Sequence, residues 1–164
     1  MDTVVESHRV RFCETDQQGI AHHSVYLQWF EVARVEWFRA VGLDYRAFEE
    51  SGRNLVVVEA SVRYRKPAYF DDALTMAVGV GELRSASVRL DYEIRRGELL
   101  LATGSTRLAC LSTAKRPERF PAETRERLEA GLARAAADED AGHEAGSNGA
   151  GRAQDASAST GSTT

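Results

Sequence analysis

One long helix with large apolar side chains on more than one face constrains this chain most. The stretch from Val25 to Val41 is preceded by Ser24, a suitable N-cap, and followed by Gly42, a suitable C′ residue. At roughly 100° per residue, seven residues form one apolar stripe: Tyr26, Trp29, Phe30, Ala33, Trp37, Ala40 and Val41. Four more lie outside it: Leu27, Val32, Val35 and Phe38. Such a helix needs cover on most sides, from a sheet that curls around it or from a sheet plus a partner chain.

The rest of the chain up to about residue 112 reads mainly as strand. A half-buried strand is predicted from Val4 to about Cys13, and further strands over 55–67, 73–80, 88–94 and 99–111, with a turn at Arg96-Gly97. Within the last strand, Leu99, Leu101 and Ala109 are the inward candidates. The connections are short, which predicts antiparallel neighbours. One strand, a helix and a four-strand meander make an α+β plan.

Two further helical segments complete the predicted order. Asp44 is expected to cap a short helix that ends near Ser51-Gly52. Pro121 marks the start of an Ala-, Glu- and Arg-rich segment that extends to about Ala137.

The composition divides the chain into a domain and a tail. The 164 residues suit one compact domain over 1–134, followed by an acidic Gly, Ser, Ala and Thr tail over 135–164 that is predicted to be disordered. The tail has five acids against Arg152 alone, whereas residues 1–134 balance 20 bases with 20 acids. A neutral domain argues against a nucleic-acid surface.

The cysteines and the apolar runs indicate the compartment. Cys13 and Cys110 lie far apart in strand-like runs, so we expect two free buried thiols and a cytoplasmic location. No secretory signal and no run of about 18 apolar residues is visible, so neither export nor a membrane partner is expected.

A carboxylate and a helix start lie close together in the stretch before the long helix. Asp16 follows the first strand, Gly19 permits a turn, and His22 and His23 precede the helix N-terminus. An acid beside unpaired backbone N–H groups could face one carbonyl of a small molecule. Two plainer interpretations stay open: Asp16 as a turn acid, and His23 as a loop histidine bonded to a backbone carbonyl. The spacing fits no standard metal-ligand pattern, so no metal or cofactor is expected.

The order of motifs resembles a known family. Glu14-Thr15-Asp16-x-x-Gly19, His23 and Tyr26, Glu31-x-x-Arg34, Tyr64-Arg65-Lys66-Pro67 and Phe70-Asp71-Asp72-x-Leu74 occur in sequence over about residues 4–120. The order is similar to that of hotdog-fold acyl-CoA thioesterases of the 4-hydroxybenzoyl-CoA thioesterase type, including the YbgC-like branch. The resemblance implies a five- or six-stranded antiparallel sheet wrapped around the long helix, and a homodimer or homotetramer joined through sheet edges.

The resemblance also implies roles for individual residues. Asp16 is the expected general base or nucleophile, and the backbone N–H of His23 the group that polarises the thioester carbonyl. Seven residues are expected around the acyl-CoA substrate: Gly19, His22, Tyr26, Arg63, Tyr64, Arg65 and Arg84. His22 would shape the acyl pocket, and the arginines would contact coenzyme A phosphates. The plainer role for each arginine is a solvated charge.

Other functions fit the same fold. One is an acyl-CoA-binding module without catalysis, against which the intact Asp16 argues. A second is a thioesterase that releases a polyketide or fatty chain from a carrier protein. A third is a hydratase or dehydratase, whose chemistry usually uses a different acid and histidine motif.

Overall fold

A single sheet with one long helix across its face makes up the described part of the chain. The computed structural model describes residues 4–131. The predicted tail over 135–164 and the predicted end of the last helix, near Ala137, lie outside these residues. The elements, in order, are β1 (Val4–Arg9), the 3₁₀ turn η1 (Phe12–Glu14), α1 (Val25–Ala40), α2 (Tyr45–Glu50), β2 (Arg53–Tyr64), β3 (Ala73–Leu83), β4 (Ser87–Arg96) and β5 (Leu99–Ser112). A last helical segment occupies 122–131.

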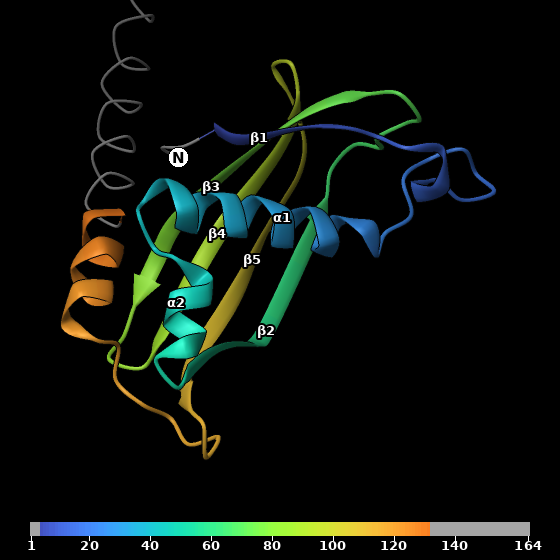
Figure 1. Cartoon of the computed structure of the whole chain (residues 1–164). Coiled ribbons are helices and arrows are strands. Elements are labelled where there is room, and N and C mark those ends of the chain that lie inside the picture. Colours follow the sequence, from blue (N-terminus) through green and yellow to red (C-terminus); the bar gives the residue numbers. More distant parts are fainter. Residues whose placement is uncertain (1–3, 132–164) are drawn as a thin grey trace, which may run out of the picture.

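The sheet has five antiparallel strands in the order β1-β3-β4-β5-β2. The helix α1 lies across one face of this sheet, with β2 at the edge (Figure 1). The predicted four-strand meander is therefore wrong in one respect. Only β3, β4 and β5 form a meander, and β2 pairs with β5 at the far edge. The segment between Tyr64 and Ala73 carries the chain from that edge back to β3.

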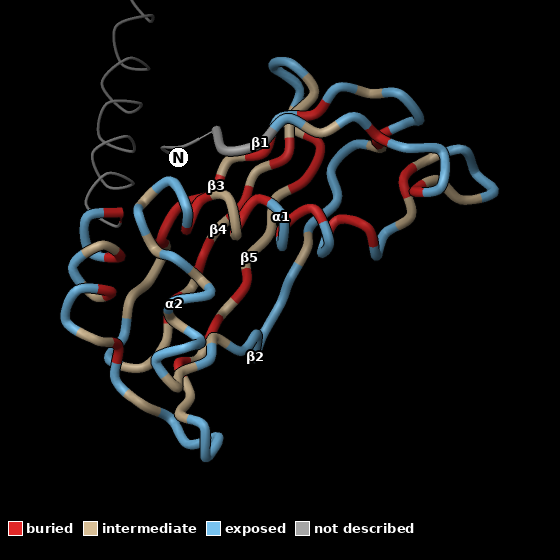
Figure 2. The backbone as a smooth tube through the Cα atoms, in the orientation of Figure 1, coloured by how far each residue is buried: buried red, intermediate tan, exposed pale blue. Residues whose placement is uncertain are grey.

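The core lies between α1 and the sheet. Phe30 of α1 and Tyr92 of β4 stack with ring centroids 4.3 Å apart and planes at 13°. Gly104 of β5 makes room for this pair, because a Cβ there would lie 2.5 Å from the Phe30 ring and 2.4 Å from the Ser61 carbonyl oxygen. Buried stretches follow the sheet side of α1 and the central strands, whereas β2 is exposed along most of its length (Figure 2).

Part of α1 is left uncovered within this chain. Leu27 and Val32 are 43% and 48% exposed on the helix. The sheet covers one side of α1, so among the described residues it does not supply the cover on most sides that this helix is expected to need.

The beginning of the chain differs from the prediction. The strand β1 ends at Arg9, and the chain then turns through η1. Phe12 is 77% exposed and Cys13 is also exposed, so the prediction of two buried thiols is right only for Cys110. The alternation fails here because the 3₁₀ turn replaces the period of two. On β5, Leu101 is buried, but Leu99 is exposed and Ala109 half-buried.

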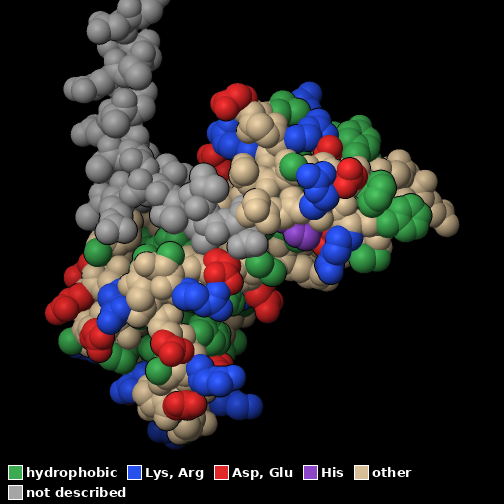
Figure 3. Space-filling view, turned by 45° about the horizontal axis from the view of Figure 1, so that its top comes forward, with side chains coloured by type: hydrophobic (Ala, Val, Ile, Leu, Met, Phe, Trp, Pro, Cys, Tyr) green, Lys and Arg blue, Asp and Glu red, His purple; other side chains and the backbone are tan. Residues whose placement is uncertain are grey.

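The surface and the helices carry two further observations. Acidic and basic side chains are interleaved over the face seen in Figure 3. No helix among residues 4–131 is long and apolar enough to cross a bilayer.

Candidate active site

A cavity opens between the loop before α1 and the end of β2. Its volume is about 500 Å³ and its walls are mainly apolar. The lining residues are Asp16, Gln18, Ile20, Ala21, His23, Tyr26, Tyr64, Arg65, Lys66 and Pro67. Five of the predicted site residues thus meet in one place, although they come from segments far apart in sequence.

Asp16 is half-buried at the wall of this cavity and is held by its own loop. Its Oδ1 accepts the backbone N–H of Gln18 at 2.8 Å, and its backbone N–H donates to the Ile20 carbonyl at 2.9 Å. Gly19 closes the turn with a positive φ of 75°. One oxygen of Asp16 therefore stabilises the turn, as in the plainer interpretation of this residue. The other oxygen accepts no hydrogen bond from residues 4–131.

His23 lies at the entrance to α1. Its backbone N–H donates to no acceptor among the described residues, as expected for a group in the turn before a helix. Its carbonyl oxygen accepts the Tyr64 hydroxyl at 2.8 Å. This bond fixes the His23 peptide against the end of β2.

The two neighbouring histidines are arranged differently. Their rings lie 4.0 Å apart, but only His23 lines the cavity. The Nδ1 atom of His22 lies 2.8 Å from the Ser24 hydroxyl. Ser24 sits at the predicted N-cap position but makes no side-chain cap to the helix, because its hydroxyl faces His22 instead.

Two tyrosines and a basic segment form the opposite wall. Tyr26 is buried, and its ring meets that of Tyr64 edge-on at 4.9 Å. Burial raises the pKa of both phenols, so they remain neutral donors or acceptors at neutral pH. The backbone N–H groups of Arg65 and Lys66 both donate to the Leu101 carbonyl, which fixes the basic segment at the rim.

Two of the predicted phosphate contacts lie elsewhere within this chain. Arg63 is exposed and lines a separate hollow with Asp91, Thr103 and Ser105. Arg84 lies in the turn between β3 and β4 and pairs with Glu82 at 2.6 Å. Its backbone carbonyl meets Arg125 of the segment 122–131, at the end of the sheet away from the loop that holds Asp16 (Figure 1).

Sequence reasoning missed the role of one residue near this site. Glu14 is 3% exposed and hydrogen-bonded to His8, Arg11 and Trp29. Arg11 and Glu14 stand at the spacing of N-cap and N3 in the 3₁₀ turn, but no spacing rule links them with His8 of a strand or Trp29 of a helix. The signal available in the sequence was the place of Glu14 in the motif Glu14-Thr15-Asp16. Gln18, Ile20 and Ala21 were also not predicted to line the site.

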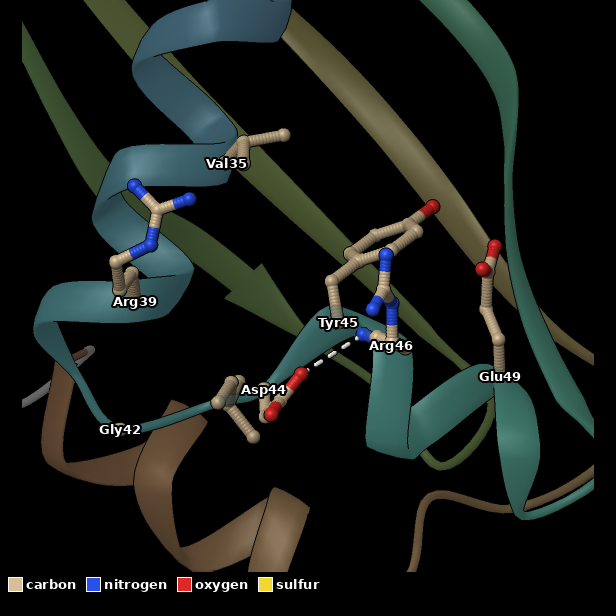
Figure 4. A pocket seen from close by; sticks show the side chains of 8 residues that line it. Val35, Arg39, Gly42, Asp44, Tyr45, Arg46 and Glu49 are labelled. Atoms are coloured by element: carbon tan, nitrogen blue, oxygen red, sulfur yellow. Dashed lines mark hydrogen bonds between the residues drawn. The ribbon is translucent and has the colours of Figure 1, made fainter.

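A second hollow lies between α1 and α2, away from the start of α1. It is lined by Val35, Arg39, Tyr45, Arg46 and Glu49, among others (Figure 4). Asp44 also lines it, but its Oδ1 caps α2 by accepting from the N–H groups of Arg46 and Ala47, as predicted. Arg39 is paired with Glu36. Among residues 4–131, no three His, Cys, Asp or Glu side chains are placed to bind a metal ion.

The comparisons with known proteins decide the family. The profile of the thioesterase-like superfamily matches residues 10–128. The chain belongs to this superfamily.

Relatives of this thioesterase-like protein are found by sequence and by structure. The acyl-CoA thioesterase YbgC of Haemophilus influenzae is 30% identical over 119 residues, which cover 71% of this chain and 88% of that relative. A crystal structure of the hypothetical protein TT1821 from Thermus thermophilus superposes with a TM-score of 0.75 and 35% identity, covering 79% of this chain and 99% of the other. The DHNA-CoA thioesterase from Staphylococcus aureus superposes with a TM-score of 0.74 and 26% identity, covering 82% and 93%. These similarities confirm the predicted hotdog fold.

Proposed function

We propose that this thioesterase-like protein hydrolyses acyl-CoA thioesters, with Asp16 as the activating carboxylate and the backbone N–H of His23 as the group that polarises the carbonyl. The observation that carries the proposal is that Asp16 and His23, just before α1, line the same cavity. Relatives named as acyl-CoA thioesterases share the superfamily and most of the chain length. Together these support thioester hydrolysis over other reactions of small carbonyl compounds.

Thioester hydrolysis requires only two groups of the protein here, one that polarises the carbonyl and one that activates the nucleophile. A thioester in the cavity would place its carbonyl oxygen toward the His23 N–H, where the positive end of α1 stabilises the charge that develops in the transition state. The Asp16 oxygen that accepts no hydrogen bond would either take a proton from water or attack the carbonyl carbon directly. Direct attack expels the thiolate and leaves a mixed anhydride on Asp16, which water then hydrolyses, so both routes release a free acid and the coenzyme A thiol. Since the thiolate is a good leaving group, no strong general acid is required.

The basic segment at the rim supports a coenzyme A ester as substrate. Arg65 and Lys66 are exposed there and form no ion pair among the described residues. Cations of this kind at the mouth of a cavity would attract a polyanionic leaving group. Arg63 and Arg84 do not line this cavity, so we propose that they contact the ligand only from another protomer or at a more distant part of the ligand.

A homo-oligomer fits the exposed edge of the sheet. The strand β2 pairs with β5 on one side, and no described residue pairs with its other side. A long unpaired edge is a surface that natural sheets usually cover. We therefore infer that two copies join at this edge. Release of an acyl chain from a carrier protein remains the second candidate, favoured by the same basic rim.

Replacing the proposed base tests the function. Asp16→Asn keeps an oxygen that can accept the Gln18 N–H but removes the charge. Turnover of a panel of acyl-CoAs is measured by the release of free thiol. We expect turnover to fall at least about 100-fold, as for loss of a positioned base. Asp71→Asn is the matched control. It removes an exposed carboxylate that contacts Arg9, at a positive φ that Asn tolerates. Unchanged turnover in Asp16→Asn would refute the assignment.

A further inference from the structure

The carboxylate of Glu14 accepts hydrogen bonds from three different parts of the fold. Its Oε2 accepts the Arg11 backbone N–H at 2.8 Å and lies 2.9 Å from His8 Nε2. Its Oε1 accepts from Arg11 Nη2 at 2.9 Å and from the Trp29 indole N–H at 3.0 Å. An ionised carboxylate only accepts, so His8 is the donor in its contact. Four donors around one carboxylate leave it well satisfied although it is almost fully buried.

These bonds join the elements that surround the proposed site. His8 belongs to β1, Arg11 precedes η1, and Trp29 lies on the second turn of α1. The main chain of Glu14 adds a fifth link, because its carbonyl oxygen accepts the His22 N–H at 2.8 Å. One residue therefore connects the strand before Asp16 with the helix after His23. Asp16 lies two residues after Glu14, and His23 follows directly after His22.

We propose that Glu14 is a positioning residue of the thioesterase site, which holds the loop with Asp16 at a fixed distance and angle from the N-terminus of α1. This inference rests on the proposed function of Asp16 and His23. Glu14 itself does not line the cavity and does not touch the substrate. Its effect on the reaction comes through geometry, since the acid and the N–H group must meet the same carbonyl.

A neutral side chain cannot replace this carboxylate. A glutamine presents one accepting oxygen and one NH₂ group, and the NH₂ group would face donors from Arg11, His8 or Trp29 in either orientation. At least one of the four hydrogen bonds would be lost, and two or more unless a neutral His8 accepts from the NH₂ group. Misplacement of a catalytic group by about 1 Å can cost about 100-fold in rate.

The test compares Glu14→Gln with the wild type and with Asp71→Asn, at a temperature where circular dichroism shows all three to be folded. We expect kcat for an acyl-CoA to fall about 10- to 100-fold. KM, and the affinity for a non-hydrolysable acyl-CoA thioether, should stay within about two-fold, because binding groups are untouched. The pH profile of kcat should keep its shape at lower amplitude, whereas loss of a catalytic base changes the shape itself. Asp71→Asn should match the wild type.

Amide hydrogen exchange supplies a readout that needs no activity. The His22 amide should exchange at least about 10-fold faster in Glu14→Gln, because its acceptor moves with the loop. Normal kcat together with unchanged His22 exchange would overturn the inference while leaving the proposed function intact. If the wild type hydrolyses no acyl-CoA, the proposed function fails, and His22 exchange alone decides whether Glu14 holds the loop.

A second variant covers the case in which Glu14→Gln does not fold. Trp29→Phe removes one of the four donors and keeps an aromatic ring in the core. We expect a smaller loss, about three- to ten-fold in kcat, with thioether affinity unchanged. Wild-type kcat in a folded Trp29→Phe, with wild-type His22 exchange, would overturn the inference.

Discussion

Tyr64 shows how a single hydroxyl can act on the proposed site through the main chain. Its OH group donates to the carbonyl of His23, the residue whose N–H is proposed to polarise the substrate, and its ring rests against Tyr26. Tyr64→Phe keeps the ring contact and removes the bond. We expect kcat to fall about three- to ten-fold with little change in KM, since a neutral hydrogen bond contributes about 0.5–1.5 kcal/mol.

The control for this variant is Tyr69→Phe, which deletes an exposed hydroxyl outside the cavity. Steady-state kinetics of both variants on one acyl-CoA give the comparison. Equal kinetic constants for the two would show that the His23 peptide is held without Tyr64.

The lowered pKa of Glu14 predicts that the free energy of unfolding depends on pH. Burial raises its pKa, but hydrogen bonds from Arg11, His8 and Trp29 outweigh burial and hold the pKa at about 2, below the usual 4.5. Because the folded-state pKa is depressed, the stabilisation is present above pH 4.5 and is lost as the pH falls toward 2. Urea unfolding at pH 7, 5, 4 and 3 should give a free-energy difference between wild type and Glu14→Gln of about 1–3 kcal/mol that shrinks with falling pH. A constant difference across this range would contradict the prediction.

At the scale of elements, local chemistry determined what the sequence could predict. The bounds of α1 differ from the predicted 25–41 by one residue; Gly42, with a positive φ, ends the helix as predicted, whereas Ser24 precedes it without capping it. The Asp44 cap and the alternation in β4 were equally local. The position of β2 was not predictable in this way, because its pairing with β5 is a long-range contact that no turn specifies. The place of Arg84 outside this cavity was unpredictable for the same reason, because its distance from Asp16 depends on which end of the sheet the turn occupies.

The contact between α1 and the sheet depends on the missing side chain of Gly104. A Cβ at this position would clash with the Phe30 ring and with the Ser61 carbonyl oxygen of the neighbouring strand. Gly104→Ala should therefore destabilise the fold by about 1–3 kcal/mol, the usual range for overpacking. Chemical denaturation measures the loss. Gly97→Ala, at a turn with open space around it but a positive φ, separates the effect of crowding from that of backbone conformation. A loss at Gly97 as large as that at Gly104 would argue against crowding as the cause.

At the scale of the whole molecule, an edge strand and the long helix both expose apolar side chains. The edge strand β2 exposes Val56, Val57 and Val58, and α1 exposes Leu27 and Val32. A second copy that continues the sheet through β2 would cover the open edge with hydrogen bonds and bring further apolar surface against α1. The helix that needs cover on most sides and the sheet that needs a neighbour are then satisfied by the same contact.

This arrangement predicts that one charge on β2 separates the copies. Val58 is 57% exposed in the single chain, and Val58→Lys would place an ammonium group in the proposed contact, a device that natural edge strands use against pairing. Light scattering after size exclusion should give a multiple of 18.1 kDa for the wild type and a shift toward that mass for the variant. Leu99→Lys replaces an apolar residue that is 41% exposed at the start of β5 and should keep the wild-type mass. A wild type that is monomeric at micromolar concentration would contradict the proposed contact. The exposed apolar side chains of α1 would then face water without a partner chain.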